Sequence, residues 1–172
     1  MTGFGRFLLR DAILLALTLG AWISASSISL PDGWIADTVA VALGALAGMC
    51  AWQAHEWGHL VFAKATGGRV HPPAGLFSVY LFGFRNAENS KFQFISMALG
   101  GFIATAIVFL LLIPLLPQDW LATRIFRSLV IIEILVTTAL EVPGLVWGMV
   151  SYKTLPSVNV LAEDAPAKSE LS

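Results

Sequence analysis

Long apolar runs alternate with short polar stretches along the chain. The apolar runs cover residues 12–30, 35–65, 94–116 and 125–152. A helix needs about 20 mainly apolar residues to cross the hydrocarbon core of a bilayer. Because lipid offers no hydrogen-bonding partner to a backbone amide, a spanning segment of this length must be helical. The pattern therefore predicts an all-α membrane protein with four transmembrane helices.

The composition supports a membrane protein and argues against a nucleic-acid-binding surface and a cysteine-based metal site. Hydrophobic residues make up 57% of the 172 residues and charged residues only 12%, against about 25% charged in a soluble domain. The net charge of -1 gives no basic surface, so we expect no nucleic-acid partner. The single cysteine, Cys50, excludes an internal disulfide and a cysteine-based zinc site. The lipid bilayer is the expected environment, and the composition leaves the oligomeric state open.

The first apolar run has two interpretations. Arg6 and Arg10 precede it and small residues occupy positions 24–26, a pattern that a cleaved signal peptide also shows. However, the run is longer than the usual apolar core of a signal peptide, and Asp11 interrupts the basic flank. These two features favour a retained transmembrane helix.

Lysine and arginine are distributed unevenly between the two ends of the predicted helices. Cytoplasmic loops of membrane proteins carry an excess of both residues. With the N-terminus inside, eight of the ten fall on the cytoplasmic side, leaving Arg124 and Arg127 outside. The eight are Arg6, Arg10, Lys64, Arg69, Arg85, Lys91, Lys153 and Lys168. We therefore expect an integral, multi-pass membrane protein with both termini in the cytoplasm.

The segment between the second and third runs, residues 67–92, is rich in β-forming residues. Two glycines at 67–68 end the preceding helix, and two prolines at 72–73 prevent a new one. The sequence predicts a strand at residues 76–82, for which residues 69–71 are a candidate partner. We expect a short β-hairpin at the cytoplasmic surface of the membrane.

The predicted elements form one domain followed by a tail. Residues 1–152 make up the predicted transmembrane domain, which includes the cytoplasmic β-rich loop at 67–92. Residues 153–172 contain two prolines and charges of both signs, which predicts a mobile cytoplasmic tail.

The second apolar run contains the motif His55-Glu56-Trp57-Gly58-His59. Two histidines four residues apart on a helix lie about 40° apart in projection, so both imidazoles can bind one metal ion. Glu56 projects within about 60° of His59 and can act on a metal-bound water without being a ligand. The motif therefore predicts a zinc site in which Glu56 is the catalytic general base.

A chance occurrence of this motif is the main alternative. Ionisable residues inside a membrane helix are costly and usually functional, but Lys64 and Arg69 allow the helix to have reached the cytoplasmic interface already. The helical pattern favours a metal site, because Gly44, Gly48 and Ala51 form one stripe with the two histidines. Small residues let another helix approach closely, so we expect the histidines to face the bundle interior.

Zinc requires a third protein ligand and an open position for water. Glu133 and Glu141 are the acidic residues within the fourth apolar run. At about 1.5 Å per residue, Glu141 lies at the depth of His55, whereas Glu133 lies about 12 Å further toward the outer side. We therefore predict that His55, His59 and Glu141 hold a Zn2+ ion. His71, beside prolines at the membrane surface, is a weaker candidate.

The motif on a membrane helix, followed by a β-rich cytoplasmic segment and a glycine-bearing third helix, resembles the site-2 protease family of intramembrane zinc metalloproteases. Residues 98–104, Ala-Leu-Gly-Gly-Phe-Ile-Ala, are similar to the third-helix motif of that family, which contains Ala-Gly-Pro, with Gly101 in the place of the proline. The resemblance implies that the motif helix and a later helix bind zinc together, with a membrane-reentrant β-hairpin between them.

The fourth apolar run departs from the family's last motif at all four marked positions. An ungapped match puts Glu133 at the family's Asn, Val136 at its Pro, Glu141 at its metal-binding Asp and Val142 at its Gly. Glu141 keeps a carboxylate, so zinc binding remains feasible. The other three residues shape the site around an unwound stretch in the family, and all three are replaced here.

The expected activity is zinc-dependent hydrolysis of peptide bonds in a transmembrane protein substrate near the cytoplasmic face. The substrate helix must unwind, and the strand predicted at 76–82 could receive it by strand addition. Two other functions stay open. A non-catalytic, protease-like membrane adaptor or scaffold is indicated by the replaced residues of the last motif, and a small transporter by Glu133 near the midplane. The lack of an inverted repeat argues against the transporter.

Overall fold

Four long helices make up most of the part of the chain that the structure describes. The computed structural model describes residues 3–28, 33–73, 75–76, 78 and 80–152, so the predicted tail at 153–172 lies outside the described residues. The helices are α1 (Gly5–Ser27), α2 (Trp34–Ala65), α3 (Lys91–Ile107) and α4 (Leu121–Ser151). A π-helical turn, η2 (Val108–Leu112), and a 3-10 turn, η3 (Ile113–Leu115), extend α3. All four spans are long and apolar enough to cross a membrane, which confirms the predicted fold class.

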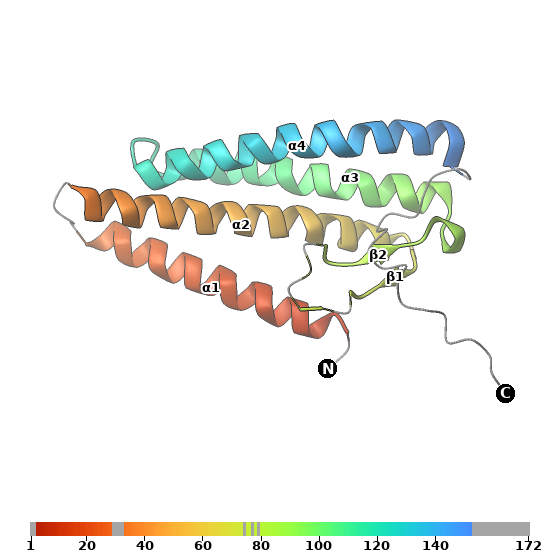
Figure 1. Ribbon diagram of the computed structural model, residues 1–172, viewed down its shortest axis with the longest axis horizontal. Coiled ribbons are helices and arrows are strands. Elements are labelled where there is room, and N and C mark those ends of the chain that lie inside the picture. Colours follow the sequence, from red (N-terminus) through yellow and green to blue (C-terminus); the bar gives the residue numbers. More distant parts are fainter. Residues whose placement is uncertain (1–2, 29–32, 74, 77, 79, 153–172) are drawn as a thin grey trace.

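The four helices lie side by side, and α2 packs against each of the other three (Figure 1). Its contact with α3 is very close: a Cβ atom added to Gly58 would lie 2.4 Å from the carbonyl oxygen of Gly100. Small residues let membrane helices approach backbone to backbone in this way. Within the stripe of α2 identified in the sequence, Gly44, Ala51 and both histidines are buried. The histidines therefore face the bundle interior, as predicted.

A two-stranded antiparallel sheet lies between α2 and α3, but its second strand comes later in the chain than predicted. Strand β1 (Val70–His71) pairs with β2 (Gly83–Phe84), with Val70 opposite Phe84. A strand within 69–71 is therefore confirmed, although it pairs with β2 and not with residues 76–82. The described residues of 76–82 lie outside any strand, so the strand predicted there is wrong for them, and positions 77 and 79 lie outside the described residues.

The two residues just before β2 are buried in the core and lie outside the sheet, which explains this difference. Leu81 and Phe82 are 2% and 7% exposed and pack in one core cluster with Phe84. The backbone N–H of Leu81 donates to the Glu56 carboxylate at 3.2 Å, so a side chain takes the place of a strand partner. Strand propensity largely measures how well a side chain fits a half-buried surface. Within the predicted strand, the sequence pattern thus identified two buried residues, Leu81 and Phe82, but not how the strands pair.

Two arginines of α1 hold the segment between α2 and α3 against the bundle. Arg6 donates from Nη2 to the carbonyl oxygen of Pro73 at 2.6 Å, and Arg10 donates from Nη1 to that of Leu76 at 2.5 Å. A short 3-10 helix, η1 (Asn86–Glu88), then leads into α3. The start of α1 and the hairpin therefore lie at the same end of the bundle (Figure 1).

Asp11 joins α1 to the helix that carries the His-Glu motif. Its side chain is largely buried, and its carboxylate accepts hydrogen bonds from Trp57 Nε1 at 2.8 Å and Gln53 Nε2 at 3.0 Å. Arg10 Nε donates to the same carboxylate at 2.6 Å. Because Trp57 lies within the motif, this contact fixes α1 beside the segment that holds the predicted ligands.

The Asp11→Ala variant is expected to lower the free energy of unfolding by about 1–3 kcal/mol, because Trp57 and Gln53 lose a largely buried acceptor. Thermal unfolding of the purified protein in detergent, followed by tryptophan fluorescence, measures this effect. Asp119→Ala, which removes an exposed carboxylate, is the control. Equal unfolding midpoints for Asp11→Ala and the wild type would show that Asp11 does not anchor α1.

Candidate metal centre

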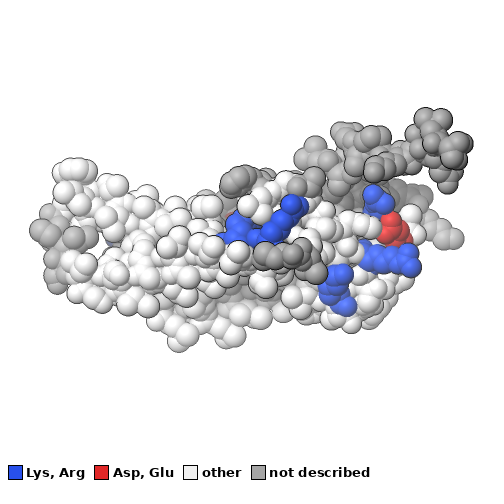
Figure 2. Space-filling view, turned by 90° about the horizontal axis from the view of Figure 1, so that it is seen from below, with Lys and Arg blue, Asp and Glu red and all other residues white. Residues whose placement is uncertain are grey.

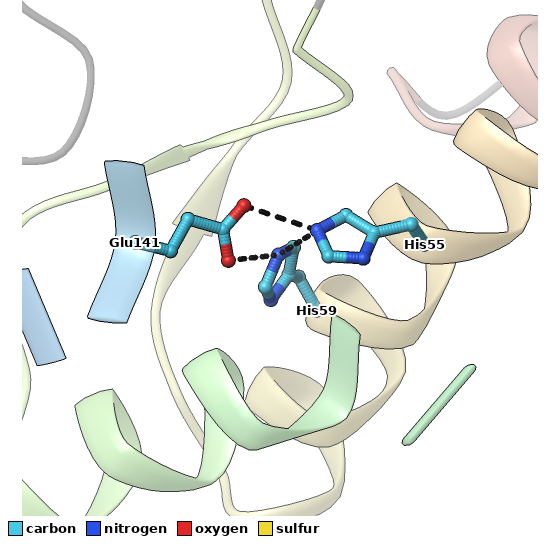
Figure 3. A group of neighbouring side chains, drawn as sticks. All are labelled: His55, His59 and Glu141. Carbon is cyan, nitrogen blue, oxygen red and sulfur yellow. Dashed lines mark hydrogen bonds and ion pairs between the residues drawn. The ribbon is translucent and has the colours of Figure 1, made fainter. Parts of the chain in front are cut away.

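The three predicted ligands meet in one cluster. His55 and His59 extend from α2, and Glu141 extends from α4 with its carboxylate directed at both imidazoles (Figure 3). One ligand atom from each residue can be chosen so that all lie within 4.8 Å of one another. The fold thus brings Glu141 to the two histidines, although it lies 82 or more positions after them in the sequence.

The distances within the cluster fit a small divalent cation. His55 Nε2 lies 2.9 Å from His59 Nε2 and 3.1 Å from Glu141 Oε1. The distance between His59 Nε2 and Glu141 Oε2 is 3.4 Å. Tetrahedral zinc with bonds of about 2.0–2.1 Å holds neighbouring ligand atoms about 3.3 Å apart. The three side chains therefore fit such an ion with shifts of only a few tenths of an ångström.

Hydrogen bonds on the far side of each ring fix which nitrogen faces the cluster. His59 Nδ1 lies 2.8 Å from the carbonyl oxygen of Met97, which can only accept, so Nδ1 carries the hydrogen. His55 Nδ1 lies 2.9 Å from Thr105 Oγ1, and that hydroxyl donates to Glu133 Oε1 at 3.0 Å. Thr105 must therefore accept from His55. Both Nε2 lone pairs then face the cluster, as metal binding by neutral imidazole requires.

Glu133 belongs to the surroundings of the cluster and is not one of the grouped ligands. Glu133 is 6% exposed, and its carboxylate accepts a hydrogen bond from the Thr105 hydroxyl, which in turn bonds to His55. Among the described residues, the group of potential ligands consists of His55, His59 and Glu141. Of the two carboxylates considered in the fourth apolar run, Glu141 is the one that the fold brings to the histidines.

Glu56 faces the same cavity as the ligands. The cavity has a volume of about 350 Å3, and Glu56, His59 and Glu141 all line it. The bond from the Leu81 N–H holds Oε2 of Glu56 in place at 3.2 Å. None of the described residues that line the cavity is lysine or arginine, so the carboxylates there make it favourable for a cation.

The backbone of α3 lies directly against the two imidazoles at Gly101. A Cβ atom added there would lie 2.3 Å from His59 Cε1 and 2.8 Å from His55 Cε1, closer than any side chain can approach. Glycine at this position therefore lets α3 close one side of the cluster. The cluster is more open at Glu141, whose side chain is 30% exposed.

His71, the weaker candidate, lies away from the cluster. It is part of β1, and its Nε2 lies 2.7 Å from Glu88 Oε2. This hydrogen bond, together with one from Arg85, holds the pKa of Glu88 below its ordinary value. His71 thus contributes to the hairpin region rather than to the group of potential ligands.

Several groups that shape the site were not identified from the sequence. Thr105 is a polar side chain in an otherwise apolar stretch, and that isolation was a usable signal. The carbonyl oxygen of Met97 and the N–H of Leu81 are backbone groups, which every residue carries, so their roles depend on the fold alone.

Comparison with known proteins gives no further guide. No family model, curated protein or solved structure matches the chain. Function must therefore be inferred from the residues and the geometry of the site itself.

Proposed function

We propose that the protein is an intramembrane zinc metalloprotease of the site-2 protease type, which hydrolyses peptide bonds of membrane-spanning substrates near the cytoplasmic face. The convergence of His55, His59 and Glu141 inside a bundle of membrane helices, with Glu56 lining the same cavity, carries this proposal. Two imidazoles and one carboxylate are a known ligand set of catalytic zinc, which keeps its fourth position open. Neutral nitrogen donors with a carboxylate favour zinc over magnesium or calcium.

The chain's own residues supply the remaining parts of the mechanism. Bound zinc supplies Lewis acidity toward a water molecule and a peptide carbonyl. Leu81 holds Oε2 of Glu56, so we assign Oε1 as the atom that accepts a proton from the attacking water. The same carboxyl group then delivers that proton to the leaving amine. Thr105 and the carbonyl of Met97 keep both rings oriented throughout.

The charge distribution supports a cytoplasmic position for the hairpin end. Figure 2 shows Lys and Arg gathered over the part of the molecule toward that end, whereas the opposite end of this face shows none. Cytoplasmic ends of membrane helices are typically rich in these residues. His55 precedes the end of α2 by ten residues, or about 15 Å. We therefore place both termini in the cytoplasm and the reaction in the cytoplasmic half of the bilayer.

A non-catalytic membrane adaptor is the second candidate. It is favoured by the residues at 133, 136 and 142, where Glu, Val and Val stand in place of the family's Asn, Pro and Gly. α4 also continues as a regular helix through these positions, although it contains Pro143. In such an adaptor, the cluster would stabilise the fold without cutting a substrate.

Metal removal distinguishes the two candidates. The purified protein is expected to hold one zinc per chain by mass spectrometry of its metals, and to cleave a single-span peptide in liposomes. Treatment with 1,10-phenanthroline should abolish cleavage, and added zinc should restore it, because the site binds the ion through only three side chains. Full cleavage after complete removal of zinc would contradict the proposal. One zinc per chain without cleavage of any membrane peptide would favour the adaptor.

A further inference from the structure

The cavity beside the cluster is much larger than the space needed for an ion and a water molecule. Its volume is about 350 Å3, within the range of about 300–1,000 Å3 that is typical of ligand pockets. It lies between α2, α3, α4 and the segment that leads into β2. The site therefore has room for part of a substrate next to the metal ligands.

The inner wall of this cavity is apolar and mostly aromatic. Phe82, Phe84, Phe94 and Met97 line it and are between 1% and 7% exposed. At the rim, Leu140 is 73% exposed and Tyr80 is 44% exposed, so the cavity opens between α4 and the segment before β2. A side chain that enters there would pass the edge of the cluster and reach the apolar wall.

Charge also restricts what the cavity can hold. The polar groups on its cluster side include the His59 imidazole and the carboxylates of Glu56 and Glu141, and no described lining residue is lysine or arginine. An acidic or polar side chain that reached the apolar wall, beyond the metal ligands, would lose its hydration without a compensating partner there. A large apolar side chain is the occupant that this lining stabilises best.

We propose that this cavity is the specificity pocket of the protease and accepts a large apolar side chain, aromatic or branched, from a residue that flanks the scissile bond. This inference rests on the proposed function and adds a substrate class to it. The enzyme should select its cut site by the size and polarity of one side chain at the depth of the cluster.

Gly144 offers a way to fill the pocket without disturbing its walls. It lines the cavity, and a Cβ atom added there would meet nothing within 4 Å. Thr137 and Gly148, which share its helical stripe, are buried, so Gly144 faces the interior and the open space in front of it is the cavity. Gly144→Ala and Gly144→Leu should therefore narrow the pocket in two steps. Gly20, on an exposed face of α1 with equally open space, gives Gly20→Leu as the matched control.

The test uses single-span peptides that differ in one guest residue, Phe, Leu, Ala or Asp, placed about 15 Å from the cytoplasmic end to match the depth of the cluster. Cleavage by the wild type in liposomes should flank the guest, with kcat/KM at least about tenfold higher for Phe and Leu than for Ala or Asp. Gly144→Leu should remove this preference by lowering kcat/KM for the Phe guest at least about tenfold, with the Ala guest unchanged. Gly144→Ala should give an intermediate preference, and Gly20→Leu should give the wild-type one.

Binding measurements separate failure of this inference from failure of the proposed function. The Glu56→Gln protein should bind the Phe peptide more tightly than the Ala peptide in detergent, and Glu56→Gln combined with Gly144→Leu should not. If the Phe peptide bound more tightly in this way but the wild type cleaved no peptide, proteolysis would be rejected and the apolar binding pocket would be supported. Cleavage of all guests with equal kcat/KM, or an equal loss for all guests in Gly144→Leu, would reject the pocket but keep the protease.

Discussion

Cleavage of a membrane-spanning substrate is expected to fall by about 100- to 10,000-fold in the Glu56→Gln variant, while zinc remains bound at one ion per chain. Glutamine has the size of glutamate, and its amide oxygen can still accept the hydrogen bond from the Leu81 N–H. It cannot, however, take a proton from water or return one to the leaving amine. The measurement is the rate of peptide cleavage in liposomes, together with the zinc content of the same preparation.

A second carboxylate provides the control for this result. Glu88 lies in η1, bonds to His71 and Arg85, and is outside the group of potential ligands. Glu88→Gln should therefore cleave at the wild-type rate. Cleavage by Glu56→Gln at a rate near that of Glu88→Gln would mean that Glu56 is not the general base.

Zinc affinity is expected to fall by more than about 100-fold in the Glu141→Ala variant. Loss of a residue that only orients a ligand typically weakens metal binding by 10- to 100-fold, and Glu141 is assigned as a ligand itself. Its carboxylate oxygens lie 3.1 and 3.4 Å from the two Nε2 atoms, and alanine leaves no atom to replace them. Competition with a chromophoric zinc chelator in detergent measures the affinity.

The zinc affinity of the Glu133→Gln variant provides a comparison with that of Glu141→Ala. Glutamine at 133 can still accept from the Thr105 hydroxyl, so the orientation of His55 should largely persist. The loss of affinity should therefore be much smaller than in Glu141→Ala. If the two variants ranked in the opposite order, Glu133 rather than Glu141 would be the third ligand.

The helices and the approximate position of the site followed from the sequence for physical reasons. Apolar runs of this length have few alternatives to membrane helices, because lipid cannot satisfy an open backbone. The depth of Glu141 could be compared with that of His55 because helical rise is constant. Glu141 also shares one helical stripe with Thr137 and Gly148, and both of these residues are buried in the bundle.

The features of the fold and the site that the sequence did not predict depend on which strands pair, how the helices are rotated against one another, and where backbone groups lie. Strand β2 lies at Gly83–Phe84 because the preceding Leu81 is drawn into the core and bonds to Glu56. The contact between Asp11 and Trp57 joins helices whose relative rotation no periodicity reveals. In the same way, the carbonyl of Met97 reaches His59 only because Gly58 and Gly100 let α2 and α3 touch.

X-ray absorption at the zinc edge of the purified protein tests most directly whether two imidazoles and one carboxylate share an ion inside this bundle. The expected spectrum shows two imidazole nitrogens at about 2.0–2.1 Å and oxygen ligands at about 2.0–2.2 Å. The imidazole signal should be lost in a His55→Ala, His59→Ala double variant. A first shell of oxygen alone, or a sulfur at about 2.3 Å, would contradict the assigned site and leave the motif without its metal.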